Sequence, residues 1–202
     1  MNFLKSKPMK NSLLLLILLF SLQWSVAQTD PTARFAQELA AKSQTIDRID
    51  CRFEQVRVMQ ILQNEVRRAG VFCYVRPDQI HLDFEGGDFI RMSEASFTMH
   101  TAGVEQQVRI QSNPMLRELK RILSACMTGD VASLTGGFTM ELKEQPTHYE
   151  VTLHPRKGRM AARMGAIRMR FERATMTLEE LRMEEPSGDY TAYRFYDKQL
   201  NR

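Results

Sequence analysis

The stretch GVFCYVRPDQIHLDFEGG, residues 70–87, contains two strand-like segments with Arg76 and Pro77 between them. In the second segment, apolar residues alternate with polar ones from Ile80 to Phe84, which is the period of a strand with one dry and one wet face. Pro77 has no backbone N–H to give to a neighbouring strand, so it ends the first segment. The stretch therefore predicts two consecutive strands that share one apolar face.

The same alternation recurs along most of the chain. Outside two helical segments, apolar and polar residues exchange places every second position, as in antiparallel strands with one buried face. The clearest examples are Phe138-Met140-Leu142, Tyr149-Val151-Leu153 and Ile167-Met169-Phe171. We expect one domain of roughly ten antiparallel strands, in a curved sheet that encloses space because few residues lie on helices that could fill it.

The apolar phase of the first predicted strand shifts between Phe53 and Val56. An extra residue in one strand of an antiparallel pair produces such a shift. We therefore expect a β-bulge at this point of the first strand.

Two segments have the period of a helix. The first opens at Pro31, which suits the first helical position, and is expected to run to about Ile46. The second reads NPMLRELKRILSACMTGD, with Asn113 as a predicted N-cap and Gly129 as the stop. Its apolar face comprises Met115, Leu119, Ile122, Leu123 and Cys126.

The N-terminus has the composition of an export signal. Three lysines within the first ten residues precede the apolar run SLLLLILLF, and small residues flank the predicted cleavage site after Ala27. We expect residues 1–27 to be a cleaved signal peptide and residues 28–202 to be the mature single domain. The residue directly after the cleavage site is Gln28 and not a cysteine, so a lipid attachment site is not expected there.

The signal peptide also accounts for most of the basic charge. The formal net charge of +4 falls to +1 when its three lysines are removed. A mature chain of nearly balanced charge gives no support for nucleic-acid binding.

Three cysteines, Cys51, Cys73 and Cys126, allow at most one intramolecular disulfide. Cys51 and Cys73 lie on consecutive predicted strands and could pair, although isolated cysteines are more often small buried apolar residues. No pair has the spacing of a metal site.

Catalysis has little support in the sequence. No nucleophile-elbow, zinc-protease or phosphate-binding motif occurs. His81, Asp83 and Glu85 share one strand face, but their successive side chains would be about 7 Å apart, too far for all three to reach one metal ion. We expect neither an enzyme, nor a metal, nor a cofactor.

The predicted dry face is rich in methionine, whose flexible side chain suits surfaces that accept varied apolar partners. An ordinary core that uses methionine is an equal alternative. These inward residues are Met92, Met99, Met140, Met169, Met176 and Met183.

The loop PRKGRMAARMG, residues 155–165, concentrates positive charge. Such a loop can contact anionic headgroups or an acidic partner, or can simply be solvated. Its basic residues are Arg156, Lys157, Arg159 and Arg163.

Taken in order, several short motifs resemble the LolA family of periplasmic lipoprotein carriers, with the second helix similar to that of Bacteroides-type members. The match spans most of the mature chain. The motifs are Phe53-x-Gln55, Gly70-x-Phe72-x-x-x-Arg76-Pro77, LHPRKG at 153–158, Ile167-x-Met169-x-Phe171, and the ending GDYTAYRF.

The resemblance implies an incomplete antiparallel β-barrel of about 10–11 strands with a helical lid over an apolar cavity for acyl chains. Arg76 would be the latch that holds the lid, which we expect to be the helix from residue 114, through carbonyls at a helix end. The lid face would comprise Met115, Leu119, Ile122 and Leu123. The cavity lining would comprise Phe72, Tyr74, Leu82, Phe84, Met92, Met99, Met140, Leu142, Val151, Met169, Phe171 and Met183.

The resemblance also implies partners. As a monomeric periplasmic carrier, the protein would take acylated lipoproteins from an inner-membrane ABC-type exporter to an outer-membrane acceptor. The alternative is a periplasmic lipid-responsive sensor of the same fold that binds a signalling protein. A hydrolase is the weakest alternative, because no nucleophile and base can be paired.

Overall fold

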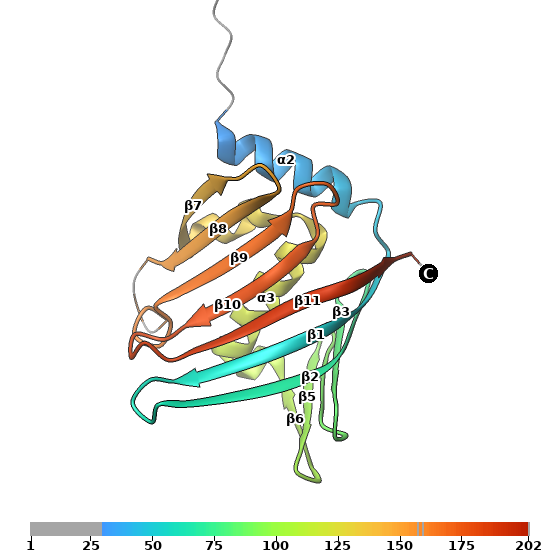
Figure 1. The fold of residues 1–202 in the computed structure, drawn as a ribbon, viewed down its shortest axis with the longest axis vertical. Coiled ribbons are helices and arrows are strands. Elements are labelled where there is room, and N and C mark those ends of the chain that lie inside the picture. Colours follow the sequence, from blue (N-terminus) through green and yellow to red (C-terminus); the bar gives the residue numbers. More distant parts are fainter. Residues whose placement is uncertain (1–29, 157, 159, 202) are drawn as a thin grey trace, which may run out of the picture. The chain divides into compact units, whose positions relative to one another are not determined.

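A single sheet, antiparallel at every strand pair, dominates the structure (Figure 1). The computed structural model describes residues 30–156, 158 and 160–201. The predicted signal peptide lies outside these residues. The strands are β1 (Arg48–Met59), β2 (Asn64–Val75), β3 (Gln79–Phe84), β4 (Phe89–Met92), β5 (Ser96–Thr101), β6 (Val104–Arg109), β7 (Phe138–Glu144), β8 (His148–Pro155), β9 (Ala166–Glu172), β10 (Leu178–Glu184) and β11 (Tyr190–Leu200).

The strand order is β6-β5-β4-β3-β2-β1-β11-β10-β9-β8-β7. Every neighbouring pair but one is consecutive in the chain. The exception joins β1 to β11, with Phe53 opposite Phe195, and so unites the N-terminal and C-terminal runs of strands in one sheet. β6 and β7 remain as edges, so the barrel is incomplete. The predicted fold class is confirmed.

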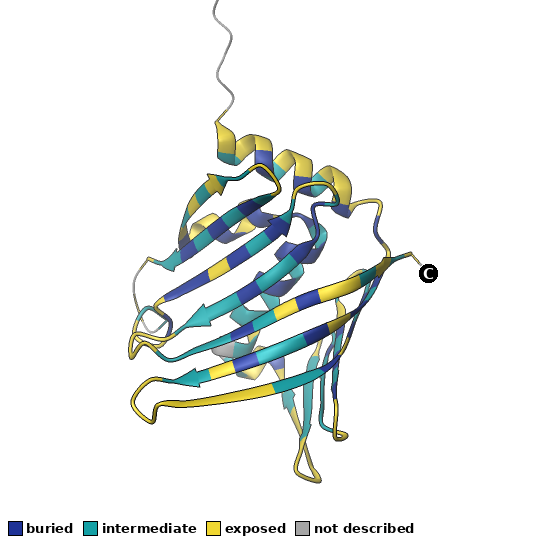
Figure 2. Ribbon diagram, in the orientation of Figure 1, coloured by how far each residue is buried: buried dark blue, intermediate teal, exposed yellow. Residues whose placement is uncertain are grey.

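Alternation of buried and exposed residues follows the sequence pattern (Figure 2). In β3, Ile80, Leu82 and Phe84 are buried while the residues between them point outward. Because side chains alternate between the two faces of a strand, the buried set lies on one side of the sheet. That side is the inner face, on which both α-helices pack.

The predicted β-bulge at Phe53–Val56 is wrong. The pairing of β1 with β2 is regular through this region, and the register shift of β1 lies at Asp50/Arg52, against β11. Val56 is buried although its side chain points to the outer face, where it lies opposite Ala192. Burial on the outer face therefore produces the apolar shift that resembled a bulge.

The two α-helices are α2 (Pro31–Ser43) and α3 (Pro114–Thr128), and the short 3-10 helices η1 (Ile110–Ser112) and η2 (Val131–Gly136) flank α3. The side chain of Asn113 accepts a hydrogen bond from the backbone N–H of Leu116 at 3.2 Å, as a predicted N-cap should. α2 ends at Ser43, earlier than the expected Ile46.

Gly129 ends α3 at the point where this helix meets α2. Its φ of +79° is one that side chains rarely adopt, and a Cβ there would lie 2.5 Å from the Cα of Ala40. Only glycine allows the two backbones to approach this closely. The residue predicted as a helix stop therefore also fixes the contact between the helices.

Replacing Gly129 with alanine should destabilise the fold strongly. The left-handed φ costs about 1–2 kcal/mol, and the clash with Ala40 adds roughly 1–3 kcal/mol. Gly103→Ala is the matched control, because Gly103 has the same φ of +79° with no atom near its missing Cβ. Urea unfolding measures both variants. Equal losses of stability would show that the helix contact contributes nothing.

Candidate functional site

An apolar cavity of about 90 Å³ lies between α3 and the inner face of the sheet. Its walls come from six strands and one helix, and its only polar side-chain group is a tyrosine hydroxyl. The lining residues are Phe72, Ile80, Leu82, Ile90, Met92, Phe97, Leu119, Leu123, Leu181, Met183, Tyr193 and Phe195.

α3 supplies one wall of this cavity. Leu119 and Leu123 line it, whereas Ile122 is completely buried in the core beside it. Arg117, on the opposite side of the helix, is exposed. Three of the four predicted lid-face residues thus face the protein interior, and the side chain of Met115 lies outside the described part of the chain.

Four of the twelve residues predicted to line a cavity do so, namely Phe72, Leu82, Met92 and Met183. The other eight do not border it. Tyr74, Phe84, Val151, Met169 and Phe171 are buried in the core, Met140 and Leu142 pack against the core, and Met99 is half-buried on β5.

The two helices explain why the cavity is smaller than the predicted one. Phe35 of α2 packs against Tyr149 and Phe171, with ring centroids 5.0 and 5.5 Å apart. Met169 is in contact with Cys126 of α3, whose Sγ lies 3.1 Å from its Sδ. The β7–β9 end of the inner face is therefore filled, and the cavity lies beside β2–β5, β10 and β11.

Six lining residues were not predicted. Four of them carried a usable signal, because Ile80 alternates with Leu82, Phe97 with Met99, and Tyr193 with Phe195 on their strands. The strand that carries Ile90 is short, and Leu181 follows a register shift in β10, so alternation is weak there. The unpredicted residues are Ile80, Ile90, Phe97, Leu181, Tyr193 and Phe195.

Arg76 binds carbonyl oxygens at a helix end, but the helix is α2 and not α3 as expected. Its guanidinium donates to the carbonyl oxygens of Ser43 and Ile46, the latter at 2.9 Å from Nη2 and 3.2 Å from Nε. Nε also lies 3.2 Å from a carboxylate oxygen of Asp47, which is exposed. Arg76 thus caps the C-terminal end of α2 and ties it to the end of β2.

A second link, which the sequence did not indicate, joins the same turn to α3. Lys120 Nζ lies 2.6 Å from Oδ2 of Asp78, and both side chains are largely buried. Asp78 follows Arg76 by two residues, so the β2–β3 turn holds both helices through adjacent side chains. An ion pair shielded from water is stronger than an exposed one.

The basic loop is only partly available to a partner. Nε of Arg156 donates to the carbonyl oxygens of Thr135 and Phe138, at 3.2 and 3.1 Å, so this side chain anchors the loop to η2 and β7. Arg163 is exposed, and its side chain has no hydrogen bond or ion pair to the described residues. Lys157 and Arg159 lie outside the described residues.

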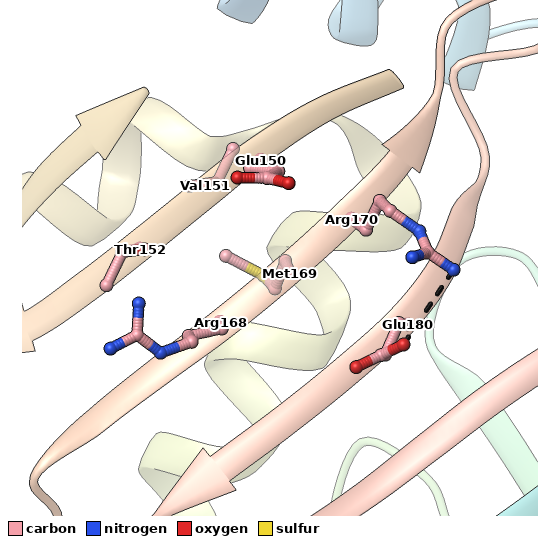
Figure 3. A pocket seen from close by; sticks show the side chains of 7 residues that line it. All are labelled: Glu150, Val151, Thr152, Arg168, Met169, Arg170 and Glu180. Carbon is pink, nitrogen blue, oxygen red and sulfur yellow. Dashed lines mark ion pairs between the residues drawn. The ribbon is translucent and has the colours of Figure 1, made fainter. Parts of the chain in front are cut away.

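A larger cavity of about 200 Å³ lies on β8, β9 and β10, and five of its seven lining residues are polar or charged (Figure 3). Each of its arginines has a carboxylate close by: Arg168 contacts Glu184 at 3.0 Å, and Arg170 contacts Glu179 at 3.0 Å. Paired charges of this kind do not suit an apolar ligand. The lining residues are Glu150, Val151, Thr152, Arg168, Met169, Arg170 and Glu180.

The cysteines are free thiols. Cys51 and Cys73 lie on opposite faces of the β1–β2 pair, because Cys51 is opposite Phe72 in the register. Burial raises the pKa of Cys51 and of Cys126 to about 12, so both thiols stay protonated at neutral pH. Neither is an activated nucleophile.

His81, which shares a strand face with Asp83, is half-buried. Burial, helped by the charge of Arg91, lowers the pKa of His81, which therefore stays neutral at pH 7. Within residues 30–156, 158 and 160–201, no three His, Cys, Asp or Glu side chains are placed to hold a metal ion. Over the same residues, no helix has the length and apolar character needed to cross a membrane.

Comparisons with known proteins agree with the fold. No protein-family model and no curated protein matches the chain. An uncharacterized conserved protein from Thermus thermophilus is similar in structure, with a TM-score of 0.51 and 6% identity over 84% of this chain and 88% of that one.

Two further solved structures are similar. A domain described as an outer membrane lipoprotein-sorting protein, from Vibrio parahaemolyticus, has a TM-score of 0.47 and 9% identity over 83% of this chain and 91% of its own. A LolA superfamily protein from Nitrosomonas europaea has a TM-score of 0.39 and 11% identity over 83% and 94%. Because the identities are this low, the similarities concern the fold alone.

Proposed function

We propose that this protein binds acyl chains in the cavity beneath α3 and carries acylated lipoproteins through the periplasm, from an exporter in the inner membrane to an acceptor in the outer membrane. The observation that carries the proposal is an apolar cavity with α3 as one wall. Each methylene group that leaves water contributes about 0.8 kcal/mol, so even part of an acyl chain binds favourably.

The cavity must enlarge to hold a long chain. Its volume of about 90 Å³ is well below the roughly 300–1,000 Å³ of typical ligand sites. α3 is the wall proposed to move, because every other wall is a strand hydrogen-bonded to its neighbours in the sheet. Arg76 caps α2 and not α3, so Asp78 of the same turn, which pairs with Lys120, is the proposed latch of this lid.

The proposal is tested by what the protein carries. Protein purified from the periplasm should hold acylated lipoproteins that mass spectrometry identifies, and it should move a lipopeptide from donor to acceptor vesicles. Retention of a lipopeptide without any transfer would contradict the carrier role. Absence of both bound acyl material and lipopeptide uptake would contradict acyl binding itself.

Arg163 offers a test of partner contact. Arg163→Glu should slow association with vesicles of anionic phospholipid severalfold and weaken its salt dependence, because this side chain is exposed and free of ion pairs among the described residues. Arg156 is unsuitable, since its bonds to Thr135 and Phe138 support the fold. Arg52→Glu, an exposed position of β1, is the control. Equal association rates for both variants would show that the loop does not contribute to vesicle binding.

A further inference from the structure

Polar side chains meet at one side of the apolar cavity, on the inner face of β1, β2 and β11. In the strand register Gln55 lies between Arg68 of β2 and Tyr193 of β11. Its Nε2 donates to the hydroxyl oxygen of Tyr193 at 2.6 Å. Since Tyr193 lines the cavity, this polar group borders the space that the proposed acyl chain would occupy.

Arg57 belongs to the same group. Side chains two residues apart on a strand share a face, so Arg57 follows Phe53 and Gln55 on the inner face. It lies opposite Thr191 and diagonal to Tyr193, within reach of a long side chain. Arg57 is exposed, and its side chain makes no ion pair or hydrogen bond with the described residues. It is therefore a cation available to a ligand.

Arg68 is held in a fixed position beside it. Its guanidinium lies 4.0 Å above the ring centroid of Phe84, and Nη2 lies 2.6 Å from Oδ2 of Asp88. Asp88 offsets the charge of Arg68, so the group of Arg57, Arg68 and Asp88 keeps one net positive charge. This placement orients Arg68 before any ligand arrives.

Two positive charges, those of Arg68 and Arg57, act on the hydroxyl group of Tyr193. Burial raises the pKa of Tyr193, while the hydrogen bond from Gln55 and the positive charges of Arg68 and Arg57 act to lower it. Both guanidinium groups are thus close enough to act on the hydroxyl. The hydroxyl proton has no acceptor among the described residues, so it can be donated to an anion.

We propose that Arg57, Arg68, Gln55 and Tyr193 form a headgroup site that selects amphiphiles with an anionic carboxylate or phosphate group. The inference rests on the proposed function, because the acyl chain is taken to occupy the adjacent cavity. Arg57 contributes the unpaired charge, and Tyr193 contributes a hydrogen bond at the boundary between polar and apolar surfaces. Charge-assisted hydrogen bonds of this kind are stronger than neutral ones.

Three probes with one chain length separate headgroup from chain. Dodecanoate, dodecyl phosphate and neutral 1-monolauroylglycerol are each titrated, at concentrations below micelle formation, against the protein loaded with a fluorescent fatty-acid analogue. The two anions should bind about tenfold more tightly than the neutral probe, as one hydrogen bond to a charged group implies. The ratio of carboxylate to phosphate affinity shows which anion the site prefers.

Arg57→Gln is the decisive variant, because Arg57 makes no bond that the fold needs. It should bring the anions to within about twofold of the neutral probe and leave binding of the neutral probe unchanged. Arg52→Gln, on the outer face of the same strand, should keep the full preference. Equal binding of all three probes by the unaltered protein, or a preference that survives Arg57→Gln, would overturn the headgroup site but leave acyl binding intact. Failure of every probe to bind would overturn both.

Discussion

Met183→Trp is expected to abolish binding of acyl chains. Met183 is half-buried on β10 and lines the cavity beneath α3. An indole ring in a space of about 90 Å³ would occupy most of it. Excluding even four methylene groups from the cavity removes about 3 kcal/mol, or roughly a hundredfold in affinity. The dissociation constant of a fluorescent fatty-acid analogue measures the effect.

The control for this prediction is Met140→Trp. Met140 is also a half-buried methionine that packs against the core, but it lies on the edge strand β7 and away from the cavity. Its replacement should leave the affinity for the analogue nearly unchanged. Thermal unfolding of both variants shows whether each still folds. Equal affinities of the two variants, with both folded, would place the acyl site elsewhere.

Arg76→Leu is expected to destabilise the protein by about 2–4 kcal/mol, since hydrogen bonds to a charged donor contribute roughly 1.5–3 kcal/mol each and water replaces part of them. The guanidinium binds two carbonyl oxygens, that of Ser43, the last residue of α2, and that of Ile46 beyond the helix. Losing this cap should loosen the end of α2. Urea unfolding and hydrogen exchange over residues 40–47 measure these effects.

Asp47→Ala separates the two kinds of contact that Arg76 makes. The side chain of Asp47 is 80% exposed, and exposed ion pairs contribute only about 0–1 kcal/mol. Its loss should therefore change the free energy of unfolding little. If Asp47→Ala destabilised the protein as much as Arg76→Leu, the ion pair rather than the helix cap would be the important contact. If neither variant changed exchange in residues 40–47, Arg76 would not hold α2 at all.

The sequence predicted the sheet because its signal is local. Alternation over a few residues identified β3, β8 and β9, and Asn113 and Gly129 marked the ends of α3. The pairing of β1 with β11 is different, because it joins segments at opposite ends of the domain. Periodicity carries no information about which distant strands become neighbours, so it could place Tyr193 and Phe195 on one face of their strand but not at the cavity.

The partner of Arg76 was open to prediction from the register of the first two strands. Arg48 lies opposite Val75, which brings Arg76 beside Asp47, four residues after the end of α2. The short connection between α2 and β1 thus brings the end of α2, and not α3, to Arg76. By contrast, the ion pair between Asp78 and Lys120 depends on how α3 docks, and no local pattern specifies it.

The position of a bound acyl chain is the most direct test of the account. A fatty acid with a photoreactive diazirine in its chain is bound to the protein, irradiated, and its attachment sites are mapped by mass spectrometry. The account predicts attachment to α3 and to the inner faces of β10 and β11, at residues such as Leu119, Leu181 and Phe195. Attachment mainly to exposed apolar residues outside the cavity, such as Ile61 or Val71, would contradict it.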